Sequence, residues 1–384
     1  MYNKRLIFWA ACAGILFFGI SITTLGSVIP ELKTKFELDE LAFGTLFSLL
    51  PFGLMVGSLI FGPFCDRYGY KFLLSLACIS MFIGFEGIAY APSQTLLQVC
   101  IFLFGLGGGA INGATSALVS DISEENKGAN LSLLGVFFAI GALGMPFILG
   151  ILDNAFSYDV IVSIVGFVTL ALAIFYLVIR FPLPKQAGGI PVAKSLHLFK
   201  DNVLLLIAFF LFFQSAFEGI INNWTTTYLG EHLSMAHDSA LFALSLSVVG
   251  MTVMRLLLGS VFRNTPAKTI WIISFLMILS GLVLLTIAQS FIIASTGLIL
   301  TGGGLAAGFP IMLGFVGNRY KDISATAFSL VFVIALAGNT IINYGMGYIA
   351  QNYGVKHLVT VGFAELGIMS ILCVLILRKI KINQ

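Results

Sequence analysis

A row of polar side chains interrupts one of the most apolar stretches of the chain, around residues 203–229. The row has the spacing of one helix face and consists of Gln214, Glu218, Asn222 and Thr225. Amide and carboxylate groups can hydrogen-bond a polar solute, and a carboxylate can also take up a proton. A charged side chain at the centre of a membrane helix costs about 2.5–3.5 kcal/mol on translocon scales, and this cost disappears beside water. The row therefore predicts a wet helix face, with Glu218 as the candidate for proton coupling.

Similar polar side chains recur in other apolar stretches, including the pairs Asn112/Ser116 and Asn339/Asn343, each four residues apart. Amides and hydroxyls both donate and accept hydrogen bonds, as the hydroxyls of a polyol do, and Trp224 can cover the apolar face of a sugar ring. The same residue types also bond between membrane helices, for about 0.6 kcal/mol on average, and a tryptophan can mark the membrane boundary. Both interpretations stay open for single residues. The predicted substrate-binding set is Gln214, Glu218, Asn222, Asn223, Trp224, Asn112, Thr115, Asn339, Asn343 and Thr24.

Three further charges lie inside apolar stretches: Arg255, Glu86 and Glu365. We expect Arg255, close to the end of its stretch, to reach the aqueous boundary or a latch contact rather than a solute. The two glutamates are interpreted as structural. The predicted site then holds one acid and no deep arginine, which favours a neutral solute over an anion.

The amino-acid composition indicates that this chain folds in a lipid bilayer. Of its 384 residues, 59% are hydrophobic and only 10% are charged, whereas soluble domains carry about 25% charged residues. Lipid must therefore surround much of the surface. The net charge of +3 gives no indication of a nucleic-acid partner. Five cysteines without metal-like spacing and four histidines at loops or span ends predict no disulfide, no metal site, no cofactor and no enzyme chemistry.

The apolar runs are long enough to cross roughly 30 Å of hydrocarbon as helices. They lie at about 6–29, 42–61, 72–90, 95–119, 129–152, 159–180, 203–229, 239–262, 269–288, 291–317, 323–350 and 358–377. We read the first run as a membrane helix rather than a cleaved leader, because it is too long and has no small-residue cleavage site. The fold class is therefore all-α integral membrane, with twelve transmembrane helices in two six-helix bundles. The predicted divisions are an N-terminal bundle (1–180), a cytoplasmic linker (181–202) and a C-terminal bundle (203–384).

The distribution of lysine and arginine predicts the orientation. With the N-terminus inside, sixteen of these residues fall on the cytoplasmic side and three outside, with Arg255 set apart within a span. This asymmetry satisfies the positive-inside rule with both termini cytoplasmic. Short loops favour a bacterial inner (plasma) membrane, and we expect a monomer.

The two halves repeat one another. Residues 107–109 and 302–304 are both triple glycines, offset by 195, while Gly62/Gly259 and Lys71/Lys268 are offset by 197. Duplication inside a membrane protein predicts two helical bundles related by an axis along the membrane normal, with the solute site between them.

The loop GPFCDRYGYKFLL, residues 62–74, carries the most specific motif. It resembles the signature loop of the major facilitator superfamily, although Phe64 and Tyr70 depart from that pattern. The resemblance implies a conformational latch formed by Gly62, Asp66, Arg67, Gly69 and Lys71. Glycines allow a tight turn and close helix ends, and the charges can bond neighbouring helix ends. The second copy has Arg263 and Asn264 in place of the Asp-Arg pair, so the latch should be lopsided.

Weaker similarities point to one group in that superfamily. TTLGSVIPELKTKFEL, residues 23–38, is similar to the first-span exit of the fucose:proton symporter group, and EGIINNWTTTYL resembles the seventh span of related sugar permeases. The two membrane acids of the symporter group fall at Ser27 and Asn112 here, so proton coupling is not implied by the resemblance.

These patterns predict a transporter that moves a monosaccharide or similar neutral polyol by alternating access, either coupled to protons through Glu218 or as an uncoupled facilitator. The expected partners are this solute, protons if coupling exists, and the lipid bilayer. The alternative is a proton-driven exporter of drugs or other metabolites, because one acid among aromatic residues can attract lipophilic cations.

Overall fold

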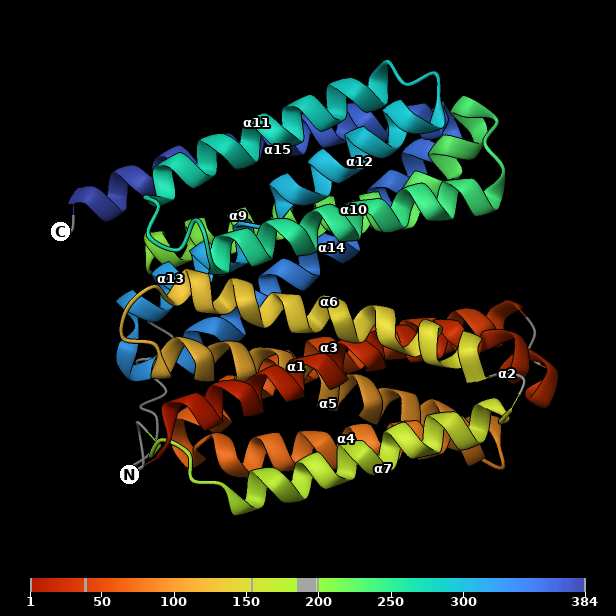
Figure 1. Ribbon diagram of the computed structural model, residues 1–384, viewed down its shortest axis with the longest axis vertical. Coiled ribbons are helices and arrows are strands. Elements are labelled where there is room, and N and C mark those ends of the chain that lie inside the picture. Colours follow the sequence, from red (N-terminus) through yellow and green to blue (C-terminus); the bar gives the residue numbers. More distant parts are fainter. Residues whose placement is uncertain (1, 38–39, 153–154, 185–197, 199, 383–384) are drawn as a thin grey trace. The chain divides into compact units, whose positions relative to one another are not determined.

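The computed structural model describes residues 2–37, 40–152, 155–184, 198 and 200–382, and every regular element in them is a helix (Figure 1). The first half of the chain contains α1 (Lys4–Ser27), α2 (Ile29–Phe36), α3 (Glu40–Tyr68), α4 (Tyr70–Tyr90), α5 (Gln94–Ile122), α6 (Lys127–Leu152) and α7 (Tyr158–Val178). The second half contains α9 (Asn202–Leu233), α10 (His237–Gly259), α11 (Ala267–Thr286), α12 (Phe291–Leu305), α13 (Gly308–Arg319), η1 (Lys321–Ile323), α14 (Ser324–Tyr353), η2 (Val355–His357) and α15 (Leu358–Ile382).

Among the described residues, twelve helical segments are long and apolar enough to span a membrane. Each overlaps one of the twelve predicted spans, which confirms the all-α membrane fold class, and the second extends to Tyr68 rather than ending near residue 61. One span differs in detail, because α12 ends at Leu305 and α13 begins at Gly308. The predicted single helix over 291–317 is therefore two helices in succession.

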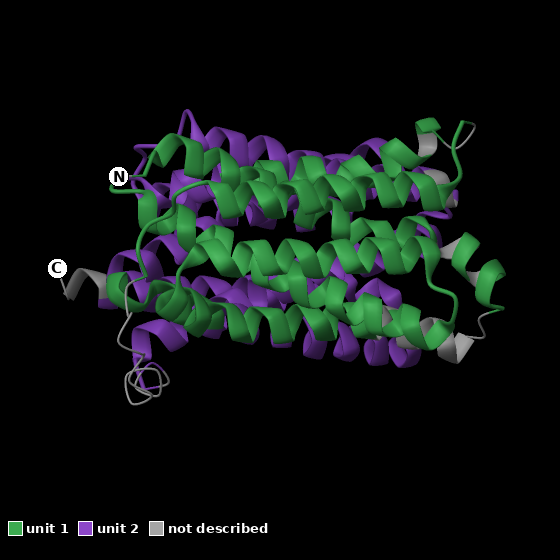
Figure 2. Cartoon of the chain, turned by 90° about the horizontal axis from the view of Figure 1, so that it is seen from below, with its two compact units in different colours: residues 1–124, 134–195, 320–329 green, residues 125–133, 196–319, 330–384 purple. Residues whose placement is uncertain are grey.

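The chain forms two compact units (Figure 2). Unit 1 comprises Met1–Glu124, Leu134–Ser195 and Tyr320–Ser329, and unit 2 comprises Glu125–Leu133, Leu196–Arg319 and Leu330–Gln384. Each unit thus includes a short segment from the other half of the sequence. Most of the predicted linker (185–197 and 199) lies outside the described residues, and the division 1–180/203–384 stays a prediction.

Both triple glycines lie at close helix crossings inside their own units. A Cβ atom on Gly109 would overlap the backbone of Leu54 in α3, and one on Gly302 would overlap the backbone of Ser247 in α10. Small residues let membrane helices approach until their backbones touch. Each triplet therefore contains a close helix crossing, α3–α5 in unit 1 and α10–α12 in unit 2, although Gly304, which the offset of 195 pairs with Gly109, lies against Ser274 of α11 instead.

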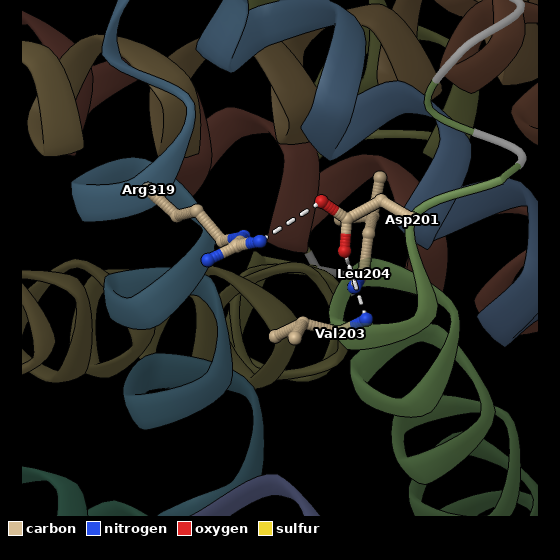
Figure 3. A network of polar contacts seen from close by, with 4 residues as sticks. All are labelled: Asp201, Val203, Leu204 and Arg319. Atoms are coloured by element: carbon tan, nitrogen blue, oxygen red, sulfur yellow. Dashed lines mark hydrogen bonds and ion pairs between the residues drawn. The ribbon is translucent and has the colours of Figure 1, made fainter. Parts of the chain in front are cut away.

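The helix that carries the polar row, α9, has a well-defined start. The Asp201 carboxylate accepts hydrogen bonds from the backbone N–H groups of Val203 (2.8 Å) and Leu204 (3.2 Å), and it pairs with the Arg319 guanidinium at 3.1 Å (Figure 3). An aspartate at this position satisfies N–H groups that have no partner within the helix. The cap therefore fixes the beginning of α9 against the end of α13.

Candidate functional site

Gln214 and Glu218, the two residues of the polar row nearest the start of α9, form a hydrogen-bonded pair. Gln214 is 1% exposed, and its Nε2 donates to Oε1 of the half-buried Glu218 at 2.9 Å. The same Nε2 donates to the backbone oxygen of Leu305 at 2.6 Å. The amide therefore orients the Glu218 carboxylate and ties it to the end of α12.

The break between α12 and α13 lies against this pair. A helix end leaves carbonyl groups without a partner inside the helix, and Gln214 satisfies the one on Leu305. A Cβ on Gly308 would overlap the Gln214 side chain, so the amide packs directly on the broken main chain. Discontinuous membrane helices place main-chain polar groups where a solute or ion can bind. The sequence signal for the break is Pro310, a residue tolerated in the first turn of a helix and costly in its interior.

Arg255 on α10 belongs to the same region. Its side chain is only 9% exposed, and its charge interacts with that of Glu218. Of the two alternatives predicted for Arg255, reaching the aqueous boundary does not fit this burial, and a latch contact stays a prediction. The acid of the polar row therefore has a cationic neighbour that sequence reasoning assigned elsewhere.

A second polar face of α9 meets α14. Asn339 Nδ2 donates to the Ser215 carbonyl at 2.8 Å, Asn343 Nδ2 donates to Asn339 Oδ1 at 3.2 Å, and Asn223 Nδ2 donates to Asn343 Oδ1 at 3.0 Å. This close approach depends on Gly219, where a Cβ would lie 2.6 Å from Asn339 Nδ2. The structure thus brings the predicted residues of α9 and α14 together as one chain of amides in unit 2.

Toward the end of α9, the polar side chains are more exposed to solvent. Asn222 and Asn223 are exposed, and Trp224 is half-buried beside Gly347 of α14. Thr225, one turn after Asn222, is buried. The row therefore runs from the buried Gln214 to exposed amides within two helical turns.

The remaining predicted substrate residues lie in unit 1. Thr24 and Thr115 are fully buried, and their hydroxyls donate to the carbonyls of Ile20 (2.8 Å) and Ile111 (2.7 Å) in their own helices. Asn112 is half-buried, and its carbonyl accepts from Ser116 Oγ at 2.8 Å. The hydroxyls of both threonines are thus satisfied locally, and Asn112 offers the more accessible amide of this group.

The stretch predicted as a loop is mostly helical: Gly62, Asp66 and Arg67 lie in the last turns of α3, Lys71 lies in the first turn of α4, and only Gly69 separates the two helices. Asp66 is 2% exposed and accepts from the backbone N–H (2.9 Å) and Oγ1 (2.6 Å) of Thr326. Gly62 lies against the first turn of α14, and Gly69 adopts a left-handed φ of 83°, the conformation that favours glycine. Arg67 stacks over the Tyr68 ring at 5.0 Å, and Lys71 is half-buried. Asp66 is thus the residue of the motif that hydrogen-bonds the start of α14.

Sequence reasoning missed a second acid in this place. Asp121, at the end of α5, accepts from the Tyr70 hydroxyl (2.6 Å) and from Ser324 Oγ (2.7 Å). Tyr70 was noted only as a departure from the family pattern. Its hydroxyl joins the start of α4 to Asp121, which Ser324 in turn joins to the start of α14.

The two glutamates interpreted as structural differ in their surroundings. Glu86 accepts from Ser163 Oγ at 2.9 Å, which joins α4 to α7. Glu365 is 3% exposed, and neither carboxylate oxygen has a hydrogen-bond partner among the described residues.

All five cysteines are buried and free. The described residues contain no group of three or more metal-ligating side chains.

Twelve helices long enough to span a membrane, among the described residues, and a duplicated sequence are typical of membrane carriers. The chain belongs to the Major Facilitator Superfamily, whose family model matches residues 11–323. The superfamily predicted from the signature loop is thereby confirmed.

Individual relatives are distant. The chain is 23% identical over 343 residues to the uncharacterized transporter y4wD of Sinorhizobium fredii, covering 88% of this chain and 90% of that protein. It is 30% identical over 203 residues to the 4-hydroxybenzoate transporter PcaK of Pseudomonas putida, covering 51% of this chain and 45% of that protein. The crystal structure of the fucose:proton symporter FucP of Escherichia coli is similar in fold, with a TM-score of 0.81 at 16% identity over 97% of this chain and 99% of that one. This likeness confirms the two-bundle major facilitator fold.

Proposed function

We propose that this protein moves a small neutral polar solute, such as a monosaccharide, across a bacterial inner membrane by alternating access. The observation that carries the proposal is the Gln214–Glu218 pair, which places an amide and a carboxylate against a broken helix in an otherwise apolar span. The amides of Asn222, Asn223, Asn339 and Asn343 continue this polar surface along α9 and α14. Such donors and acceptors suit a polyol.

Several features support a polyol. The amide chain contains no formal charge, and Trp224 adds an aromatic surface beside it that can cover the C–H face of a sugar. FucP, whose fold this chain shares, is a fucose:proton symporter.

The proposed orientation rests on a separate observation: the charge distribution of the loops favours cytoplasmic termini. The roles predicted for Asn112, Thr24 and Thr115, which lie in unit 1, stay predictions.

Glu218 is the proposed proton-coupling residue. Its carboxylate accepts from Gln214 and interacts with the charge of Arg255, so the charge on Glu218 is linked to the polar groups around it. Solute and proton binding at this one place would couple their movements.

The test is uptake of radiolabelled sugars into proteoliposomes with and without an inward proton gradient. We expect the wild type to accumulate solute above equilibrium only with the gradient. Glu218→Gln should equilibrate solute without accumulating it, whereas Glu86→Gln, the same change in an acid bonded to Ser163, should keep accumulation. Accumulation by the Glu218→Gln variant would reject Glu218 as the coupling residue, and equal wild-type uptake with and without the gradient would reject symport.

A second solute class is favoured by one observation. Arg255 provides a buried cation near Glu218, and PcaK is a 4-hydroxybenzoate transporter. A carboxylate solute would bind Arg255 by charge-assisted hydrogen bonds while Glu218 is protonated. Uptake of 4-hydroxybenzoate by the wild type, lost in Arg255→Gln, without any sugar uptake, would select this class over the neutral polyol.

A further inference from the structure

The duplication places equivalent residues around the starts of α14 and α6. An offset of 197 pairs five positions of unit 1 with five of unit 2: Asp66 with Arg263, Asp121 with Asn318, Tyr70 with Ala267, Ser324 with Lys127, and Thr326 with Ala129. The structure supports this pairing at the glycines. Gly62 lies against Ala325 and Thr326 of α14, and Gly259 lies against Ala129 and Leu133 of α6.

In unit 1, two carboxylates fill the space around the helix start. Asp66 accepts both polar hydrogens of Thr326, and Asp121 accepts from Tyr70 and Ser324. The two carboxylates therefore accept every hydrogen bond named here, from Thr326, Tyr70 and Ser324, and their negative charge strengthens these bonds.

In unit 2, neither acid is present, and the space is a cavity of about 230 Å³. All five counterparts line it: Lys127, Ala129, Arg263, Ala267 and Asn318. No aspartate or glutamate occurs among the described residues that line the cavity. A single water needs only about 10–15 Å³ of such volume, so the cavity can hold an anion of several atoms.

The cavity is also positively charged. Lys127 is 8% exposed and donates to the Gly317 carbonyl at 2.9 Å, which holds its ammonium in the cavity wall. Arg263 is exposed and brings a guanidinium whose fork geometry suits phosphate oxygens. Asn318 and Asn126 bring amide groups to the same wall. Two cations with amide donors, and no acid, match the chemistry of a phosphate group.

We propose that this cavity binds a phosphate-type anion, which takes the place that the carboxylates of Asp66 and Asp121 occupy in unit 1. The anion can be the headgroup phosphate of an acidic phospholipid or a free phosphate. In either form it bridges the start of α6 to the loop between α10 and α11, as Asp66 bridges the end of α3 to the start of α14.

The test uses the purified, delipidated full-length protein in a neutral detergent. Sodium phosphate should raise the Tm of the wild type in a saturable way, beyond sodium chloride at equal ionic strength, because a ligand that binds only the folded state stabilises it. Arg263→Asp supplies the missing carboxylate and should abolish the response, and Arg263→Gln should weaken apparent affinity about tenfold. Arg180→Asp makes the same charge change at a residue that does not line the cavity, and it should keep the wild-type response.

Nanodiscs of phosphatidylglycerol and of phosphatidylcholine distinguish the two sources. Phosphatidylglycerol retained by the wild type in native mass spectrometry, and lost in Arg263→Asp, would identify a lipid headgroup. Saturation by inorganic phosphate with no preference between the lipids would identify a free anion. The proposal is overturned if neither phosphate nor phosphatidylglycerol stabilises the wild type, or if Arg180→Asp loses the response as fully as Arg263→Asp. None of these outcomes depends on transport, so they are independent of the solute proposal.

Discussion

The starts of α14 and α6 are held by opposite chemistry in the two units. In unit 1 an acid, Asp66, accepts from the N–H of Thr326 at the beginning of a helix. In unit 2 a cation, Lys127, donates to the carbonyl of Gly317 at the end of α13. Both arrangements match the polarity of a helix end, since anions suit N-termini and cations suit C-termini. The offset of 197 places Lys127 at the position of Ser324, so a donor is kept at the start of both helices, while its acceptor changes from the Asp121 carboxylate to a main-chain carbonyl.

The glycines show which part of the contact depends on shape alone. Gly62 and Gly259 both let a loop-side helix touch the start of another helix, although the charged residues around them differ. Close approach therefore survives in both copies, and the charges are the part that diverged. This difference makes the two loops natural controls for one another.

The largest expected effect is the loss of Asp66. Asp66→Ala leaves the Thr326 N–H and hydroxyl buried without their acceptor, and hydrogen bonds to charged groups contribute about 1.5–3 kcal/mol each. We expect the free energy of unfolding to fall by about 3 kcal/mol. Arg263→Ala, its counterpart, is an exposed substitution and should change it by less than about 0.5 kcal/mol in phosphate-free buffer. Denaturation monitored by intrinsic fluorescence measures both, and equal losses would break the proposed contrast.

The next effect concerns the two glycines. A Cβ on Gly62 would lie 2.5 Å from the Ala325 carbonyl oxygen and 2.7 Å from Thr326 Cα, which are backbone atoms. A Cβ on Gly259 would meet mainly the Leu133 side chain, which can rotate, and the Ala129 carbonyl only at 3.3 Å. Overpacking costs about 1–3 kcal/mol, so we expect Gly62→Ala to lower stability by about 2 kcal/mol and Gly259→Ala by less than about 1 kcal/mol. A larger loss for Gly259→Ala would show that α6 is attached more rigidly than α14.

A smaller effect is expected from one hydroxyl. Tyr70→Phe removes the donor to Asp121 at 2.6 Å and keeps the ring. The half-buried Asp121 carboxylate then loses one charge-assisted hydrogen bond, which should lower stability by about 1.5 kcal/mol. Tyr68→Phe, at a tyrosine that is 50% exposed, is the matched control and should have little effect. If both variants behave alike, Asp121 does not need Tyr70.

The sequence predicted most of the fold because hydrophobic length and charge asymmetry are local properties. Twelve apolar runs became twelve spans, and the glycine repeat marked two real helix crossings. The Gln214–Glu218 pair also followed from spacing alone, since both residues lie on one helix. Patterns within a single helix therefore carried over directly.

Contacts between distant segments were harder to predict. Arg255 and Glu218 lie on different helices, and nothing local in the sequence indicates that their charges interact. The α12–α13 break at Leu305–Gly308 depends on the Gln214 amide, which is 91 residues away from the carbonyl that it satisfies. The role of Asp121 depends on Ser324, 203 residues later. Tertiary structure, rather than periodicity, creates these parts of the site and of the latch.

The smallest expected effect tests a surface contact in the same comparison. Lys4 and Glu124 form an ion pair in unit 1, and the offset of 197 replaces them with Asp201 and Lys321, which reverses the signs. The hydrogen bond from Lys4 holds the pKa of Glu124 below its ordinary value of 4.5. A carboxyl whose pKa is lower in the folded state stabilises the fold above its unfolded pKa, and this contribution is lost as the pH falls through the folded value. Glu124→Gln should therefore lower the Tm slightly at pH 7 and not at all well below pH 4, with the difference shrinking in high salt. Glu125→Gln serves as the neighbouring control, and a Glu124→Gln effect that is equal at all pH values would assign the contact to packing instead of charge.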